Sequence, residues 1–358
     1  MDLVGERKLR DFWYPVAPSD KISATPLPFT LLNQKIVLWR NSENNICAIQ
    51  DKCSHRGAEL SKGTVCNGNI VCPYHSWEFN LEGQCVNVPQ SKLAHIPKSF
   101  KVPSYHCAEK YGHVWVCLGN PIIDIPDIPE TNQTEYRTFP CFWETWNTSS
   151  MRVVENELDM AHFASVHKGT FGNPAVPLPL SYDLKQLNDF SLQLISELAV
   201  KAPPQQMKNT RASEELTTRL MKITWYMPFI IRLHISYPSG LEHIIMNCPT
   251  PINNEQIKVV QFCFRNDTES EASIEDILKF ERLILNEDRF ILETTPPFVN
   301  LDPQFENHIP TDRAGLLMRK LFLKYLNSSQ IELNDSDNLE YLLKPESTSN
   351  QSEKHSTS

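Results

Sequence analysis

Short runs of apolar residues alternate with polar turns over the first third of the chain. The runs at 35–40 and 46–50 flank a polar turn, and Asn67-Gly68 is a strong signal for a β-hairpin. Runs of the same kind continue to residue 118. Short, evenly spaced strands joined by turns are typical of a small all-β domain.

Longer elements follow in the second half of the chain. Residues 190–265 alternate between apolar and polar positions, with the period of strands in a larger sheet. Three other segments have the apolar spacing of helices, and we expect helices at 151–163, 273–293 and 311–327. Strands and helices that are segregated in this way predict the α+β class.

Proline marks the boundary between the two regions. Residues 121–134 contain three prolines, which fit neither a helix interior nor a central strand, and we expect a linker there. A chain of 358 residues is long enough for two domains. We therefore expect one domain at 10–120 and a second at 135–328. The polar tail at 345–358 is predicted to be disordered.

Composition and charge narrow the possible partners. The net charge is −9 and Lys and Arg are scattered, so nucleic acid is not an expected partner. No apolar run is long enough for a transmembrane segment, and the first residues do not resemble a signal peptide. Ten Cys in a chain of this length indicate free thiols in a reducing compartment, so we expect a cytoplasmic location.

Two short motifs have the spacing of a metal cluster. Cys53-Ser-His55 is followed, after sixteen residues, by Cys72-Pro-Tyr-His75, and each motif lies at the tip of a predicted hairpin. Two facing loops could hold a [2Fe–2S] cluster of the Rieske type, in which two Cys bind one iron and two His bind the other. A structural zinc is the alternative, but zinc sites usually pair Cys with Cys and His with His. We therefore predict a [2Fe–2S] cluster on Cys53, His55, Cys72 and His75.

A second group of polar residues indicates a mononuclear metal site. Asn156, Asp159 and His162 are three residues apart, so they would lie along one side of a helix. His167 follows five residues later, which places it about 140° away from His162 on an ideal helix. Both His can face one metal only if the helix ends or bulges between them, and we predict such an irregularity there.

The third ligand of such a site must come from elsewhere in the chain. Two His and one carboxylate with open positions are typical of non-heme Fe(II) oxygenases. In the helix predicted at 273–293, Asp288 lies nearest the centre of the apolar stripe, with Glu287 only about 20° further away. A carboxylate that faces a core is costly unless it is paired or metal-bound. Glu281 is expected to be an ionised surface acid, and Glu287 is either that or the ligand.

These motifs resemble those of the Rieske non-heme iron oxygenases of the α-subunit type. The stretches Cys-Ser-His-Arg-Gly and Cys-Pro-Tyr-His-Ser-Trp are similar to that family's cluster-binding loops. Its signature N-x₂-D-x₂-H-x₄-H is matched by Asn156, Asp159, His162 and His167. The family usually has Gly where this chain has Ser76, a departure that we expect to be structural. Respiratory-chain Rieske proteins add a Cys to each cluster loop, and this chain does not.

The resemblance covers about residues 10–325 and carries expectations for fold and site. It implies a Rieske domain followed by a helix-grip domain, in which a curved antiparallel sheet wraps a long C-terminal helix. His162 and His167 would bind ferrous iron, and the family's acid–Asp pair makes Asp288 the third ligand. Asp159 would connect the two metal centres across a subunit boundary of a homotrimer, and Asn156 would lie near the iron.

The expected reaction follows from the same resemblance, which is closest to monooxygenases and demethylases such as the hydroxylases of cyanobacterial toxin pathways. The chain would use O₂ to hydroxylate or demethylate a small organic substrate. It has no G-x-G-x-x-G motif, so its electrons would come from a separate ferredoxin or NAD(P)H-dependent reductase. The alternative is an electron-transfer protein without oxygenase chemistry. We expect the substrate pocket near Phe163, Phe171, Trp225, Phe229 and His234.

Overall fold

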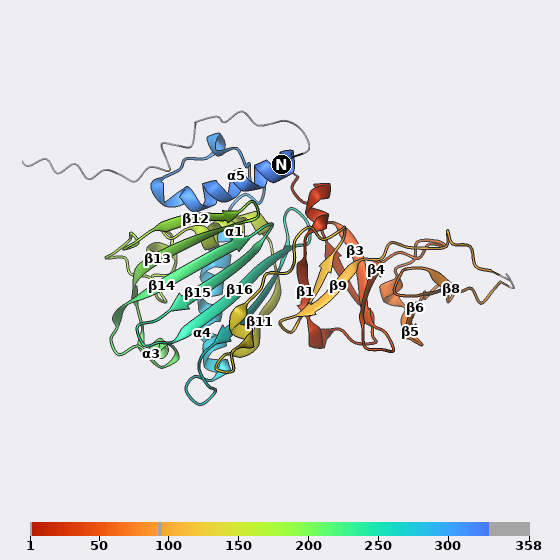
Figure 1. Cartoon of the computed structure of the whole chain (residues 1–358), viewed down its shortest axis with the longest axis horizontal. Coiled ribbons are helices and arrows are strands. Elements are labelled where there is room, and N and C mark those ends of the chain that lie inside the picture. Colours follow the sequence, from red (N-terminus) through yellow and green to blue (C-terminus); the bar gives the residue numbers. More distant parts are fainter. Residues whose placement is uncertain (1, 92–94, 329–358) are drawn as a thin grey trace, which may run out of the picture.

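The structure is a computed structural model, and it describes residues 2–91 and 95–328. Figure 1 shows a smaller β-rich region, formed by the first part of the chain, beside a larger region in which helices lie against a seven-stranded sheet. This is the expected α+β architecture, with the β-rich part first. The tail that was predicted to be disordered, 345–358, lies outside the described residues. Within the described part, no helix has the length and apolar character needed to cross a bilayer.

Three small antiparallel sheets build the N-terminal region, with the orders β1-β10-β9, β2-β3-β4 and β5-β6-β7-β8. Asn67 and Gly68 form the turn between β5 and β6, with φ angles of 50° and 82°, so the hairpin prediction is confirmed. Two-residue hairpin loops favour such positive φ angles because they match the twist of the strands. The strands are β1 (Tyr14–Pro18), β2 (Leu27–Leu31), β3 (Gln34–Arg40), β4 (Ile46–Gln50), β5 (Thr64–Cys66), β6 (Asn69–Val71), β7 (Glu78–Phe79), β8 (Cys85–Asn87), β9 (His106–Lys110) and β10 (His113–Cys117).

The large sheet is antiparallel throughout, with the order β11-β17-β16-β15-β14-β13-β12. Along β13 the burial alternates from Leu192 to Val200, as the sequence pattern predicted for strands with one face on a core. The strands are β11 (Arg137–Trp146), β12 (Asp183–Asn188), β13 (Ser191–Lys201), β14 (Leu216–Tyr226), β15 (Ile230–Ser236), β16 (Glu242–Pro251) and β17 (Ile257–Arg265).

Helices lie against this sheet. Figure 1 shows α4 behind the sheet and α5 along its β12–β13 edge. The expected helices at 273–293 and 311–327 correspond to α4 and α5. The helices are α1 (Ser150–Leu158), α2 (Phe163–Val166), α3 (Pro204–Thr210), α4 (Ile274–Leu292) and α5 (Arg313–Asn327). Short 3₁₀ helices occupy Arg7–Asp11, Ser19–Lys21, Leu60–Lys62, Pro129–Asn132, Pro303–Phe305 and Pro310–Asp312.

The helix that was expected at 151–163 is interrupted, so that prediction is wrong in its second half. The backbone of Asp159 is extended, with φ −94° and ψ 117°, and α1 ends at Leu158. The carboxylate of Asp159 accepts a hydrogen bond from the amide of Ala161 at 2.7 Å. Such side-chain-to-backbone bonds compete with helix continuation. Asp159 and His162 therefore do not share a helix face with Asn156.

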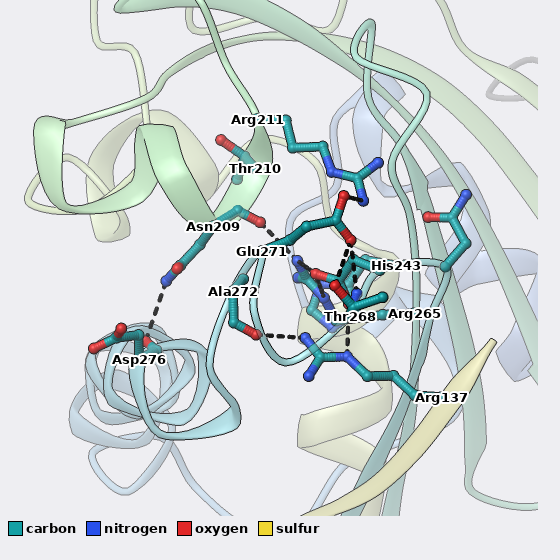
Figure 2. A network of polar contacts seen from close by, with 12 residues as sticks. Arg137, Asn209, Thr210, Arg211, His243, Arg265, Thr268, Glu271, Ala272 and Asp276 are labelled. Atoms are coloured by element: carbon teal, nitrogen blue, oxygen red, sulfur yellow. Dashed lines mark hydrogen bonds and ion pairs between the residues drawn. The ribbon is translucent and has the colours of Figure 1, made fainter. Parts of the chain in front are cut away.

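Buried charges tie the start of α4 to α3 and the sheet (Figure 2). Arg265 donates to the carboxylate of Asp267 at 2.7 Å and to the carbonyl of Asn209 in α3 at 2.6 Å. Arg137 donates to Asp267 at 2.7 Å and to the carbonyl of Ala272, just before α4, at 2.6 Å. A buried carboxylate is tolerated when cations and hydrogen bonds surround it in this way. The network fixes the two helices that line the cavity described below.

Candidate metal centres

The first cluster loop is a tight turn that begins at Cys53. Its amide donates to the carbonyl of Ala58 at 2.8 Å, and the amide of Gly57 donates back to the carbonyl of Cys53 at 2.9 Å. Gly57 has φ +77°, a conformation that costs little only for glycine. The loop therefore closes on itself and holds the residues between Cys53 and Gly57 at its tip.

A second loop repeats this hydrogen-bond pattern from Cys72. Its amide donates to the carbonyl of Trp77 at 2.8 Å, and the amide of Ser76 donates to the carbonyl of Cys72 at 3.0 Å. Ser76 occupies the place of Gly57 and has φ +56°. The departure from the family's usual glycine therefore falls on a position where the backbone is left-handed, as expected for a structural residue.

The four predicted cluster ligands lie together between these loops. The Cys53 and Cys72 side chains are buried and interact with each other, and burial raises the pKa of the Cys53 thiol to about 11. The His55 and His75 rings lie on the outer side, with their centroids 4.6 Å apart. His55 also stacks on Trp77 at 4.5 Å. Two inner thiols and two outer imidazoles fit a Rieske [2Fe–2S] cluster, whose irons favour the thiolate form.

The mononuclear site is formed by residues on both sides of α2 and on α4. Nε2 of His162 lies 3.2 Å from Nε2 of His167, and Oδ1 of Asp288 lies 3.6 Å and 3.3 Å from these two atoms. Metal bonds to imidazole nitrogen and carboxylate oxygen are about 2.0–2.2 Å long, so ligands at right angles lie about 3 Å apart. The three atoms therefore fit one metal ion with its other positions open. The helix end expected before His167 is present, because α2 ends at Val166.

Glu287 is not the surface acid that the sequence suggested. Its carboxylate accepts a hydrogen bond from Nδ1 of His167 at 2.9 Å and another from the Thr170 hydroxyl at 2.8 Å. Metal-bound His normally donates its second ring N–H in this way, which fixes the tautomer and the ring orientation. Glu287 was misread because the His167–Thr170 segment that it meets lies far away in the sequence.

Asp159 and Asn156 lie beside the other histidine. Nδ1 of His162 is 3.4 Å from the Asp159 carboxylate, an ion-pair distance that is not aligned as a hydrogen bond. Burial acts to raise the pKa of Asp159, but its interactions with His162 and the Ala161 amide lower it below the usual value. Nδ2 of Asn156 is 3.4 Å from the Asp288 carboxylate and 3.5 Å from Nε2 of His162. The sequence motif therefore brings its members together despite the helix break.

A cavity adjoins these three ligands and is bounded by the helices α1 to α4 and the sheet. Phe163 and Phe171 line it, as predicted. Its polar wall was missed, because Glu157 and Glu281 read as ordinary helical acids. Glu281 was expected on the surface, yet it points into the cavity. The polar residues that line the cavity, besides those of the metal site, are Glu157, Gln206, Arg219, Tyr237, Asn247, Gln261 and Glu281.

Three of the expected pocket residues lie elsewhere. Trp225 is four residues beyond Met221 on β14, so it shares the face that lines the cavity, but Phe322 of α5 covers it. Phe229 also packs on Phe322, with the ring centroids 5.7 Å apart. His234 follows Leu233 on β15 and therefore points to the opposite face, where it contacts Glu242.

Comparisons with known proteins agree with both halves of this arrangement. Residues 12–105 match the Rieske [2Fe-2S] domain family, and residues 146–327, just over half of the chain, match the vanillate O-demethylase oxygenase C-terminal domain family. Methylxanthine N1-demethylase NdmA of Pseudomonas putida is 28% identical over 331 residues, which cover 88% of this chain and 87% of that protein. The oxygenase component of dicamba O-demethylase from Stenotrophomonas maltophilia is 33% identical over 164 residues, 45% of this chain and 48% of that protein.

Solved structures give the same result over nearly the whole chain. NdmA of Pseudomonas putida CBB5 with caffeine superposes with a TM-score of 0.78 at 26% identity, and the match covers 91% of this chain and 93% of that one. Dicamba monooxygenase bound to dicamba has a TM-score of 0.76 at 20% identity, which shows the shared fold alone. The chain therefore belongs to the Rieske non-heme iron oxygenases, among those with the C-terminal domain of vanillate O-demethylase oxygenases.

Proposed function

We propose that the chain hydroxylates or oxidatively demethylates a small organic substrate at a ferrous iron held by His162, His167 and Asp288. The observation that carries this proposal is the triangle of ligand atoms, 3.2–3.6 Å apart, at the wall of a cavity. Two His and one carboxylate leave open positions for O₂ beside a substrate. Iron in such a site supplies the oxygen-activating chemistry.

The protein's own groups orient this site and shield it. Glu287 holds the ring of His167 through its 2.9 Å hydrogen bond, and Asp159 lies against Nδ1 of His162. Phe163 and Phe171 form an apolar wall beside the two histidines, with the Phe171 ring stacked 4.7 Å from His167. Water is thereby excluded from part of the cavity, which strengthens polar interactions inside it.

The N-terminal region supplies the electrons in this proposal. Cys53, Cys72, His55 and His75 would hold the [2Fe–2S] cluster, with the exposed His55 at its outer rim. The Rieske domain would span 10–120, the linker 121–134 and the catalytic domain 135–328. A separate ferredoxin or NAD(P)H-dependent reductase would reduce the cluster in the cytoplasm.

We also propose that electrons pass between chains of a homotrimer. Within one chain, the cluster loops beside β5 to β8 lie at the end of the N-terminal region away from the large sheet, whereas the iron ligands lie among α1, α2 and α4 (Figure 1). A neighbouring chain would bring its cluster closer to the iron. Large apolar side chains are exposed on and after α4, where they could take part in subunit contacts: Leu283, Phe290, Phe298, Phe305 and Ile309.

Counting metals tests the proposal. An oxygenase of this kind holds about three irons per chain, whereas an electron carrier with a cluster alone holds about two. We expect Asp288→Ala to lose one iron and keep the electron paramagnetic resonance signal of the reduced cluster. Two irons in the wild-type protein, with no change in Asp288→Ala, would leave the electron-transfer alternative. O₂ uptake should also require an added reductase system, and turnover from NADH alone would contradict the separate donor.

A further inference from the structure

Two carboxylates face the cavity from opposite helices. Glu157 on α1 and Glu281 on α4 are partly buried and border the same space as the iron ligands. Glu281 forms no hydrogen bond and no ion pair within the described part of the chain. Burial raises the pKa of each carboxyl to about 7, so the ionised forms lack sufficient compensation from the protein itself.

The same wall carries hydrogen-bond acceptors without partners. Oε1 of Gln206, Oδ1 of Asn247 and Oε1 of Gln261 are buried and accept no hydrogen bond among the described residues, and each side chain is at most 5% exposed. Nδ2 of Asn247 donates to Glu157, which leaves its oxygen directed elsewhere. Native proteins rarely leave buried polar atoms unpaired, so these acceptors point to a bound group that donates hydrogen bonds.

One cation, Arg219, also borders the cavity; it pairs with neither acid, and its buried Nε donates no hydrogen bond among the described residues. The Arg219 guanidinium lies over the Phe171 ring at 4.3 Å and over the Tyr237 ring at 5.5 Å. Arg265 and, to a smaller extent, Arg219 lower the pKa of Glu281 through their charges. Arg219 does not contact Glu281. The two carboxylates therefore remain available to a ligand.

We propose that the cavity recognises its substrate by a basic nitrogen group with several N–H donors, a protonated amine or an amidinium, held between Glu157 and Glu281. The inference rests on the proposed function, because the same cavity then presents the neighbouring carbon atoms to the iron site. The body of the substrate would pack against the apolar part of the wall, formed by Leu233, Ile235, Ile245, Phe280, Ile284 and Leu285. Anionic substrates would be rejected by the two carboxylates.

Three probes of similar size and different charge test this recognition. Benzamidine is a planar cation with N–H donors, benzamide is neutral, and benzoate is an anion. Calorimetric titration of the iron-loaded protein at pH 8 should give benzamidine an affinity at least about tenfold above that of benzamide, as expected for charge-assisted hydrogen bonds. Benzoate should not bind. No benzamidine binding, equal binding of benzamide, or preferred binding of benzoate would each overturn the inference.

Variants connect the binding to the carboxylates and separate it from the proposed function. Glu281→Gln preserves the side-chain shape and should weaken benzamidine at least about tenfold while leaving benzamide within about threefold. Glu275→Gln, on the exposed first turn of the same helix, should change neither. If Glu281→Gln keeps three irons per chain and full benzamidine affinity, the inference fails and the proposed function stands. If the wild-type protein lacks the third iron but binds benzamidine through Glu281, the proposed function fails and recognition stands.

Discussion

Nδ1 of His167 donates a hydrogen bond to the carboxylate of Glu287 across 2.9 Å. This pair connects the segment after α2 to α4, and the Thr170 hydroxyl holds the same carboxylate from the other side. Because Glu287 precedes Asp288 in the chain, one turn of α4 supplies both a candidate ligand and the group that orients another ligand.

Replacing this orienting carboxylate should weaken metal binding without affecting the cluster. We expect Glu287→Gln to lower the affinity for the mononuclear iron about 10–100-fold, as is typical when the partner of a metal-bound His is lost. Iron per chain after dialysis against a ferrous chelator measures the effect, and the spectrum of the cluster should not change. Glu275→Gln on the exposed end of α4 is the matched control. Unchanged iron retention in Glu287→Gln would show that Glu287 does not support metal binding through His167.

Ser76 offers a stability prediction in the cluster domain. Its φ of +56° is unfavourable for a residue with a Cβ atom, and its exposed hydroxyl forms no hydrogen bond within the described residues. Ser76→Gly should therefore raise the free energy of unfolding by about 0.5–1 kcal/mol. The converse change, Gly57→Ala at φ +77°, should lower it. Thermal unfolding of the cluster-loaded protein measures both, and a destabilised Ser76→Gly would show that the serine side chain has another role.

Spacing along the chain indicated candidate metal ligands because each pair is local. Cys53 and His55 share one loop, and His162 and His167 bracket one short helix, so their separation does not depend on the tertiary fold. The cost of a carboxylate facing a core also indicated Asp288 of α4 as a candidate, and the structure places its carboxylate beside His162 and His167. Each of these arguments concerns residues within one loop or one helix.

Contacts between distant elements were not predictable in the same way. The roles of Glu281 and Glu287 depend on how α4 docks, which a helical wheel does not contain. Trp225 faces the cavity side of its strand, and only the position of α5 decides that it is covered. At the break after Leu158 the Asp159 carboxylate accepts the Ala161 amide, a local hydrogen bond that competes with helix continuation and that apolar spacing does not predict.

The buried carboxyl of Glu281 predicts how stability depends on pH in the ligand-free protein. Burial raises its pKa from 4.5 to about 7, so the folded state binds the proton more tightly than the unfolded state. The contribution to stability is full below pH 4.5 and is lost as the pH rises to about 7. Glu281→Gln should therefore be more stable than the wild type by about 1–3 kcal/mol at pH 8, and by less at pH 5.5. Denaturant unfolding at both pH values measures this, and a difference that is constant with pH would contradict it.

The last prediction concerns the path of electrons through Asp159. Oδ1 of this residue accepts the Ala161 amide at 2.7 Å, and Oδ2 lies 3.4 Å from Nδ1 of His162. Its side chain is 34% exposed, so it lies between the iron site and the surface. A charged acid in such a place is costly unless its oxygens are paired, and a cluster histidine from a neighbouring chain, His75, would supply a further donor. The carboxylate would then contact ligands of both metal centres.

Asp159→Asn keeps the size of the side chain but replaces one acceptor oxygen with a donor, so it should break that connection. We expect the variant to retain about three irons per chain, but its prereduced cluster should reoxidise at least about tenfold more slowly. A factor of about ten corresponds to the free energy of one hydrogen bond to a charged group. Stopped-flow absorbance in a single turnover with O₂ and a compound that the wild type oxidises measures the rate. Asp20→Asn, on an exposed site in the N-terminal region, should reoxidise like the wild type. Equal rates in Asp159→Asn and the wild type would remove Asp159 from the electron path, because the metal sites are filled in both proteins.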